Sequence, residues 1–307
     1  MPEQIKPSRV RYIKLGAGGV WEAECLERGI MRIGFGIENA ERFDQCRTGR
    51  WNDLFESFIA EGTNKGTATR FTRELRLFFE DDGSTLWITF VGERLCWGFI
   101  DDASPAPHAD GDGGWRPIAR GWRWSDLNGE ELTKDRLSGA LTKLAAYRGT
   151  SCGVDQADYI VRRINGTKTP AVERALVASL EMKKATLGLM RLLHPRDFEL
   201  LVDLVFTTSG WRRVGTVGKT QKTLDLDLVL PSTGERAFVQ VKSKTTSQEL
   251  TDYVATLEDS PFHRMFYVFH SGEATTDDER VSVIGPESLA DLVMDAGLVN
   301  WLIRKVS

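Results

Sequence analysis

The strongest constraint on the fold of this 307-residue chain is the order of helix and strand patterns in its second half. Apolar residues at 195–206 recur at intervals of three and four, the period of a helix with one buried face. The full order is a helix at 195–206, strands at 224–230 and 237–241, a helix at 247–258, strands at 264–269 and 281–284, and a helix from 286 to a stop at Gly297. This order predicts a mixed sheet with helices on both faces.

The first half of the chain carries a different pattern, rich in short strands and tryptophan. Seven of the nine tryptophans precede residue 125. Strands are expected at 9–15, 30–35, 73–79, 85–91 and 95–100. The Asp82-Gly83 turn between two apolar runs is typical of a β-hairpin. A loop is expected at 101–114 and a helix at 131–147.

These patterns predict an α/β (α+β) protein of two domains. We expect a β-rich recognition domain at 1–150 and a linker at 151–170, where Gly, Asn, Thr and Pro accumulate. The second domain then covers 171–307 and starts with a long helix, for which Pro170 is a suitable first residue.

Composition excludes some functions and leaves others open. A net charge of −4 argues against a nonspecific coat on nucleic acid, but an enzyme with a local basic groove remains possible. No run of about 18 apolar residues is present and the N-terminus lacks an apolar signal core, so we expect a cytoplasmic protein without a membrane partner. The four cysteines form no Cys-x-x-Cys pair and are expected to be reduced thiols.

Two neighbouring strands carry residues suited to metal-dependent chemistry. Asp225 and Asp227 share one face of the first strand, because side chains alternate with a period of two. Gln240 and Lys242 share a face of the second strand, and the short turn between the strands allows the two pairs to converge. Carboxylate and amide oxygens suit Mg²⁺ or Mn²⁺, which can polarise a phosphoryl oxygen and activate water. The lysine could orient or deprotonate that water.

This arrangement resembles the PD-(D/E)XK nuclease superfamily, and most closely its Mrr-like restriction endonuclease branch. That branch has Gln where other members carry a second acidic residue. The resemblance covers about 196–298 and rests on segments 196–202, 210–211, Asp227-Leu-Val-Leu230, Val239-Gln-Val-Lys-Ser243 and 283–292. It implies a restriction-endonuclease-like sheet flanked by helices.

The resemblance assigns roles to individual residues. Asp227 would bind the metal, Lys242 would be the catalytic lysine, and Gln240 would take the usual glutamate position. Glu199 would be the acid of the first helix that reaches the metal, directly or through water. The family usually has glycines before its aspartate, and their absence here leaves Asp225 as a competitor for the metal. Asp227 is preferred because an apolar run follows it directly.

DNA contacts are expected from both halves of the chain. In the second half, Lys219 and Lys222 could bind phosphates. In the first half, aromatic and basic residues near expected loops could stack on a base or contact DNA. These candidates are Trp21, Trp51, Trp122, Arg123 and Trp124.

Residues 8–125 loosely resemble the PUA-like β-barrel group, which includes the EVE and SRA-type readers of modified bases. A nuclease fused to such a reader resembles a type IV, modification-dependent restriction enzyme that acts in defence against foreign and phage DNA. The expected partner is modified double-stranded DNA. A double-strand break needs two active sites, so a homodimer on DNA is also expected.

Two alternatives stay open. An Mrr-like nuclease effector could be gated by a small nucleotide or a phage protein rather than by a modified base. The chain could also be a non-catalytic binding protein on a degenerate nuclease fold, although the presence of Asp227 and Lys242 argues against that reading.

Overall fold

The computed structural model describes residues 3–214, 225–258 and 262–307, and the chain divides into two compact units, Met1–Lys168 and Thr169–Ser307. Each unit is described by itself. Within the described ranges, no helix combines the length and the apolar character needed to cross a membrane.

Unit 1 contains two open sheets. The larger has the order β4-β3-β1-β7 and consists of β1 (Arg9–Ile13), β3 (Thr85–Val91), β4 (Arg94–Phe99) and β7 (Ser151–Gly153). β1 lies parallel to β3 and antiparallel to β7, and β3 and β4 form a hairpin. The smaller sheet has the order β2-β6-β5, with β2 (Ile30–Ile33), β5 (Ala106–Pro107) and β6 (Gly114–Pro117). The strands expected at 9–15, 30–35, 85–91 and 95–100 are therefore confirmed.

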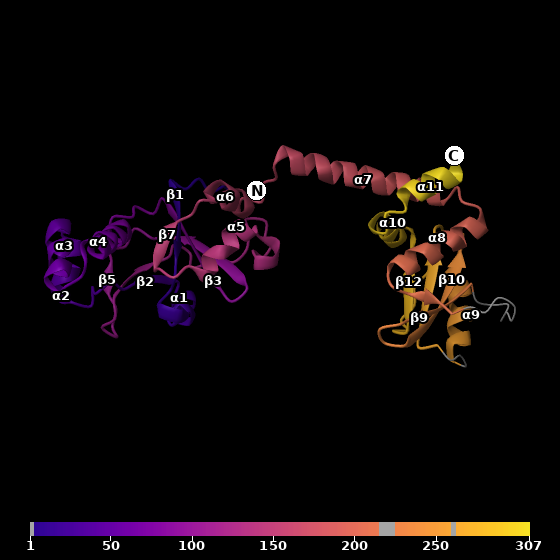
Figure 1. Ribbon diagram of the computed structural model, residues 1–307, viewed down its shortest axis with the longest axis horizontal. Helices are drawn as coiled ribbons and strands as arrows, with labels where there is room; N and C mark the ends of the chain where they lie inside the picture. The colour runs from indigo at the N-terminus through magenta and orange to yellow at the C-terminus, as the bar shows by residue number, and fades with distance from the viewer. Residues whose placement is uncertain (1–2, 215–224, 259–261) are drawn as a thin grey trace. The chain divides into compact units, whose positions relative to one another are not determined.

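Helices make up much of the rest of unit 1. They are α1 (Glu22–Arg28), α2 (Ala40–Arg47), α3 (Trp51–Ala60), α4 (Lys65–Phe79), α5 (Gly139–Thr142) and α6 (Ala157–Ile164). Short 3-10 turns occur at η1 (Ala17–Gly19), η2 (Lys134–Arg136) and η3 (Lys143–Ala146). Helices α2, α3 and α4 pack on one another and gather at one end of the unit (Figure 1).

The strand expected at 73–79 is wrong, because this segment is the end of α4. Asn64 caps that helix by accepting a hydrogen bond from the backbone of Thr67. The buried residues Ala68, Leu75 and Phe78 then follow at helical spacing. With α2 to α4 occupying this region and both sheets open, the described part of unit 1 forms no closed barrel, and the expectation of a β-rich PUA-like barrel is not met.

Two further expectations for unit 1 also fail. The single helix expected at 131–147 is replaced by η2, α5 and η3, because the backbone turns to an extended conformation at Leu137. The segment 151–168, expected to be linker, belongs to the folded unit. There β7 pairs with β1, and α6 buries Ile160 and Ile164 in the core.

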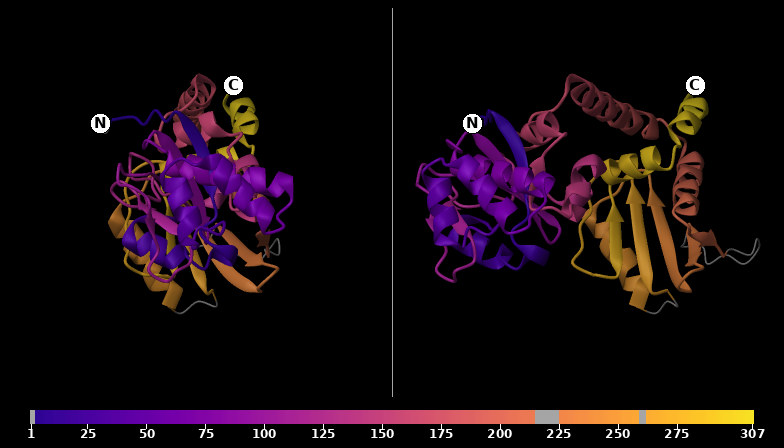
Figure 2. Two further views of the ribbon diagram at one scale, coloured as in Figure 1. Left: turned by 90° about the vertical axis from the view of Figure 1, so that its left-hand side faces the viewer. Right: turned by 60° about the vertical axis from the view of Figure 1, so that its left-hand side comes forward.

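Unit 2 is built on one mixed sheet in the order β12-β11-β10-β9-β8. Its strands are β8 (Arg212–Arg213), β9 (Leu226–Leu230), β10 (Glu235–Lys242), β11 (Arg264–Phe269) and β12 (Val281–Ile284). β9 and β10 are antiparallel, whereas β10, β11 and β12 are parallel to one another. Figure 2 (right) shows these strands running side by side.

The helices of unit 2 are α7 (Pro170–Met190), α8 (Pro195–Thr208), α9 (Ser247–Glu258), α10 (Pro286–Asp295) and α11 (Val299–Val306). Helices α10 and α11 pack beside α7 (Figure 1). Alternate residues of β10 enter different cores. Val239 packs with residues of α8 and α10, whereas Phe238 packs with Leu250 of α9. The expected mixed sheet with helices on both faces is thus confirmed.

Candidate functional site

The β9–β10 hairpin brings Asp225 against Gln240. The register pairs Leu226 with Val239, so the residue before β9 lies across from the residue after Val239. Oδ2 of Asp225 accepts a hydrogen bond of 2.5 Å from Nε2 of Gln240 and one of 2.7 Å from the backbone N–H of Val241. One carboxylate oxygen of Asp225 therefore accepts hydrogen bonds from both a side chain and the main chain of β10.

Gln240 is 4% exposed, and its other amide atom, Oε1, is buried without a hydrogen-bond partner among the described residues. A buried acceptor without a partner is costly, and it marks a position where an ion or water is needed. This oxygen lies on the same side chain whose nitrogen is already bound to Asp225.

Two carboxyl groups lie close enough to disturb each other. Burial raises the pKa of Asp225, although the Val241 amide, the charge of Lys242 and the Gln240 amide act in the opposite direction. Burial also raises the pKa of Glu199 on α8, and the negative charge of Asp225 raises it further. The positive charges of Arg196 and Arg213 offset only part of the rise in the pKa of Glu199, and a further cation near the two carboxyls would favour their ionised forms.

Lys242, at the end of β10, faces Tyr253 of α9. Its ammonium lies 5.0 Å from the centroid of the Tyr253 ring. A hydrogen bond with Tyr253 is the main cause that raises the pKa of Lys242, and the charge of Asp225 contributes to it. Lys242 is therefore a stable cation near Asp225, able to stabilise negative charge and unsuited to take a proton from water.

Asp227, the aspartate that the sequence favoured, takes a different partner. Its Oδ2 lies 2.7 Å from Nη2 of Arg236, and its Oδ1 is buried without a partner in the described part of the chain. Asp227 lies across from Phe238 rather than from Gln240. The structure thus joins Asp225 to Gln240, within electrostatic reach of Lys242 and Glu199, and places Asp227 two residue pairs further along the hairpin.

This donor set fits a hard divalent cation. It offers carboxylates from Asp225 and Glu199 and the unpaired amide oxygen of Gln240, and Mg²⁺ binds through one or two carboxylates while keeping several waters. Among residues 3–214, 225–258 and 262–307, no group of three or more His, Cys, Asp or Glu could enclose a metal. A site of this sparse kind suits Mg²⁺ or Mn²⁺ better than a closed zinc site. Lys219 and Lys222, expected to bind phosphate, lie outside the described residues.

Two of the tryptophans proposed to contact DNA have structural roles in unit 1. Trp122 is buried and donates its indole N–H to the carbonyl of Ile30 at 2.8 Å. Trp51 donates to Glu80 at 2.9 Å and packs against Phe79. Trp124 is 46% exposed and stays available for contacts.

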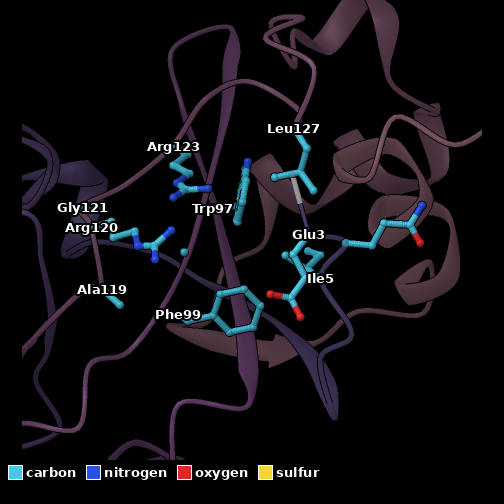
Figure 3. Close-up of a pocket in the computed structure, with 11 residues that line it drawn as sticks. Glu3, Ile5, Trp97, Phe99, Ala119, Arg120, Gly121, Arg123 and Leu127 are labelled. Carbon is cyan, nitrogen blue, oxygen red and sulfur yellow. The ribbon is translucent and has the colours of Figure 1, made fainter. Parts of the chain in front are cut away.

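Arg123 lines a pocket of about 310 Å³ beside β4, shown in Figure 3. Its guanidinium covers a face of Trp97 at 5.2 Å, and Trp97 is itself 2% exposed with its N–H bound to Ser125. The carboxylate of Glu3 also lies in this pocket (Figure 3). The charged side chains of its lining are thus those of Arg120, Arg123 and Glu3.

Trp21 lines a separate pocket together with the glycine run that follows β1. The four cysteines are free thiols, as expected, and burial raises the pKa of Cys25 to about 11 and that of Cys46 to about 12. In unit 2, Tyr253 was not anticipated, since a tyrosine on a helix carries no sequence signal that it faces a lysine on a strand.

Comparison of the chain with protein-family models, with curated proteins and with solved structures finds no match.

Proposed function

We propose that the protein is a Mg²⁺-dependent DNA endonuclease of the modification-dependent type, with its active site in unit 2. The observation that carries this proposal is the hydrogen bond between Asp225 and Gln240. The other amide atom of Gln240 is buried without a partner among the described residues, and the charge of Asp225 acts on both Lys242 and Glu199. The order of elements in unit 2 adds support, because it agrees with the restriction-endonuclease-like arrangement that the sequence resembles.

In this proposal Asp225, Glu199 and Gln240 would hold the cation. When bound, Mg²⁺ would supply charge to polarise the phosphoryl oxygen and to favour ionisation of the attacking water. The backbone amide of Val241 keeps Asp225 oriented toward the site through the bond to Oδ2. Lys242 keeps its proton on Nζ and holds the negative charge that develops on the phosphate.

Tyr253 acts through Lys242. Its ring and hydroxyl restrain the lysine side chain, so Tyr253 is a positioning residue rather than a catalytic one.

Unit 1 is the proposed gate. A nuclease that reads little sequence needs a separate signal before it cuts, and a modified base in foreign or phage DNA would supply it. Two copies on the duplex, each with one active site, would make the double-strand break.

The test is cleavage by the purified full-length chain with Mg²⁺ on a panel of otherwise identical DNAs carrying different cytosine and adenine modifications. We expect cleavage of at least one modified DNA, none in a chelator, and none by the double variant Asp225→Asn, Lys242→Met. The exposed substitution Asp295→Asn is the matched control and should cut normally. Undiminished cleavage by the double variant would refute the assignment of the site.

A further inference from the structure

Unit 1 contains a groove formed by two adjoining pockets of about 330 Å³ and 350 Å³. They share Phe35, Arg148, Gly149 and Thr150, so they are parts of one surface hollow. The glycine run after β1 lines one end and α4 lines the other. Each part lies within the size range of small-ligand sites.

Aromatic rings line this groove. Trp21 is half-buried, and its indole N–H has no acceptor among the residues that the structure describes. The Arg32 guanidinium lies over the Trp21 ring, 4.4 Å from its centroid. The indole N–H of Trp21 is a donor beside the cavity, whereas Trp51, Trp87, Trp97 and Trp122 donate to protein acceptors. Gly16 permits this position, since its φ is +83° and a Cβ there would lie 2.7 Å from Val20 and 3.0 Å from the Trp21 ring.

Phe35 stands where the two pockets meet. Its φ of 68° is in the left-handed region, which a bulky residue rarely adopts, and its ring packs against Phe71 at 4.7 Å. Backbone strain of this kind is kept where the surroundings fix it, and it concentrates at ligand sites.

The groove is also cationic. Lys14, Arg70 and Arg148 line it, and in the part of the chain that the structure describes none of them forms an ion pair. The one acid in the lining, Glu74, is 2% exposed and already bound to Arg11 and Arg73. The charges of Arg70 and Arg148 are therefore left for a ligand, whereas the charge of Lys14 also acts on Glu22 and opposes the rise that burial causes in the pKa of that carboxyl.

Main-chain donors lie in the same place. The backbone N–H groups of Arg148, Gly149 and Thr150 donate to no acceptor within the described ranges. Free amides next to an arginine and a lysine form a site that suits phosphate oxygens.

The geometry points to a binding site for one nucleotide, with its base against Trp21 and Phe35 and its phosphate on Lys14, Arg148 and the amides of 148–150. The nucleotide is either a base turned out of DNA or a free nucleotide, since both present the same chemistry. The role of this site as the gate of the nuclease rests on the proposed function, whereas binding itself does not depend on cleavage.

The test uses the full-length Asp225→Asn chain, so that DNA is bound without being cut. Its probes are the deoxynucleoside monophosphates, with and without base methylation, and short duplexes that carry one modified cytosine or adenine. Titration calorimetry measures their affinity for this chain and for versions that also carry Trp21→Leu, Trp21→Phe or Arg148→Ala. Matched controls carry Arg94→Ala or Arg136→Ala, each of which changes an exposed arginine outside the groove.

We expect Trp21→Leu and Arg148→Ala to weaken binding by about tenfold or more, Trp21→Phe to keep most of it, and the controls to keep all of it. Binding by monophosphates identifies a free nucleotide as the ligand, and binding by modified duplexes alone identifies an extruded base. Wild-type affinity in both groove variants, or no binding of any probe, would overturn the proposal. If the probes bind but the wild-type chain does not cut DNA, the proposed nuclease function is contradicted and the binding site is not.

Discussion

The carboxylate of Asp225 is bonded to the side-chain amide of Gln240 across the β9–β10 hairpin, at 2.5 Å. The same oxygen accepts the N–H of Val241, so the contact is fixed by the main chain as well. Asp227, two residues further on, is held instead by Arg236. The two aspartates are therefore expected to contribute unequally to catalysis.

Replacing Asp225 by Asn should lower single-turnover cleavage with Mg²⁺ at least about 100-fold, because the site loses a charged metal ligand. Both hydrogen bonds to Asp225 go to one oxygen, which the Asn carbonyl can replace, so the fold should be kept. Asp227→Asn loses a half-exposed ion pair and should change the rate by less than about tenfold. A larger loss of rate in Asp227→Asn than in Asp225→Asn would assign metal binding to Asp227 instead.

The raised pKa of Asp225 also predicts an effect on stability. A carboxyl that binds its proton more tightly in the folded state than in the unfolded state destabilises the fold once it is ionised. Asp225→Asn should therefore melt at a higher temperature than the wild type near neutral pH. This advantage should shrink as the pH falls toward the unfolded pKa of about 3.9. Thermal unfolding at several pH values measures it, with Asp295→Asn as a variant that should track the wild type throughout.

Cleavage at a fixed, subsaturating Mg²⁺ concentration should rise with pH as Asp225 and Glu199 ionise, because only their ionised forms bind the cation. The alkaline side should stay flat up to the ordinary lysine pKa of about 10.4 and beyond, since the pKa of Lys242 is raised too. In Tyr253→Phe the alkaline limit should move to lower pH while the acid limb stays in place. The pH dependence of the single-turnover rate measures both the acid and the alkaline limb. An alkaline limb at the same pH in Tyr253→Phe and in the wild type would contradict the positioning role of Tyr253.

Acid should weaken unit 1 through Glu24. The hydrogen bond from Arg32 is the main cause that lowers the pKa of Glu24 to about 2, and those from Arg28 and His108 add to it. The stability contributed by this carboxylate is present above the unfolded pKa of about 4.3 and is lost as the pH falls toward 2. Glu24→Gln should thus lower the melting temperature at neutral pH and match the wild type in acid. Tryptophan fluorescence can follow the transition, since Trp21 stacks on Arg32 at 4.4 Å.

The sequence predicted the order of elements in unit 2 because each element there has its own period of buried residues and a clear stop. It failed at 73–79, where a short apolar run around Arg and Glu is compatible with either a strand or a helix. This segment is helical because Asn64 caps α4 fifteen residues before its end, and because α4 packs against α2 and α3.

Sequence patterns could not predict whether Asp225 or Asp227 contacts Gln240, for a different reason. Residues two apart on a strand share a face, so a period of two cannot separate them. Only the register of the hairpin decides which one lies across from Gln240, and the register depends on the turn. The groove of unit 1 was hidden for a similar reason, since Trp21, Phe35 and Arg148 are far apart in the chain and meet only in the fold.

The bond between the Val241 amide and Asp225 links activity to strand pairing. A shift of β9 against β10 by one residue would turn Asp225 to the opposite face and separate it from Gln240 and Lys242. A newly made or misfolded chain therefore lacks the assembled candidate site until this hairpin has closed in its native register. For the proposed nuclease, which could damage the DNA of its own cell, correct folding would in this way be a safeguard that acts before any ligand binds.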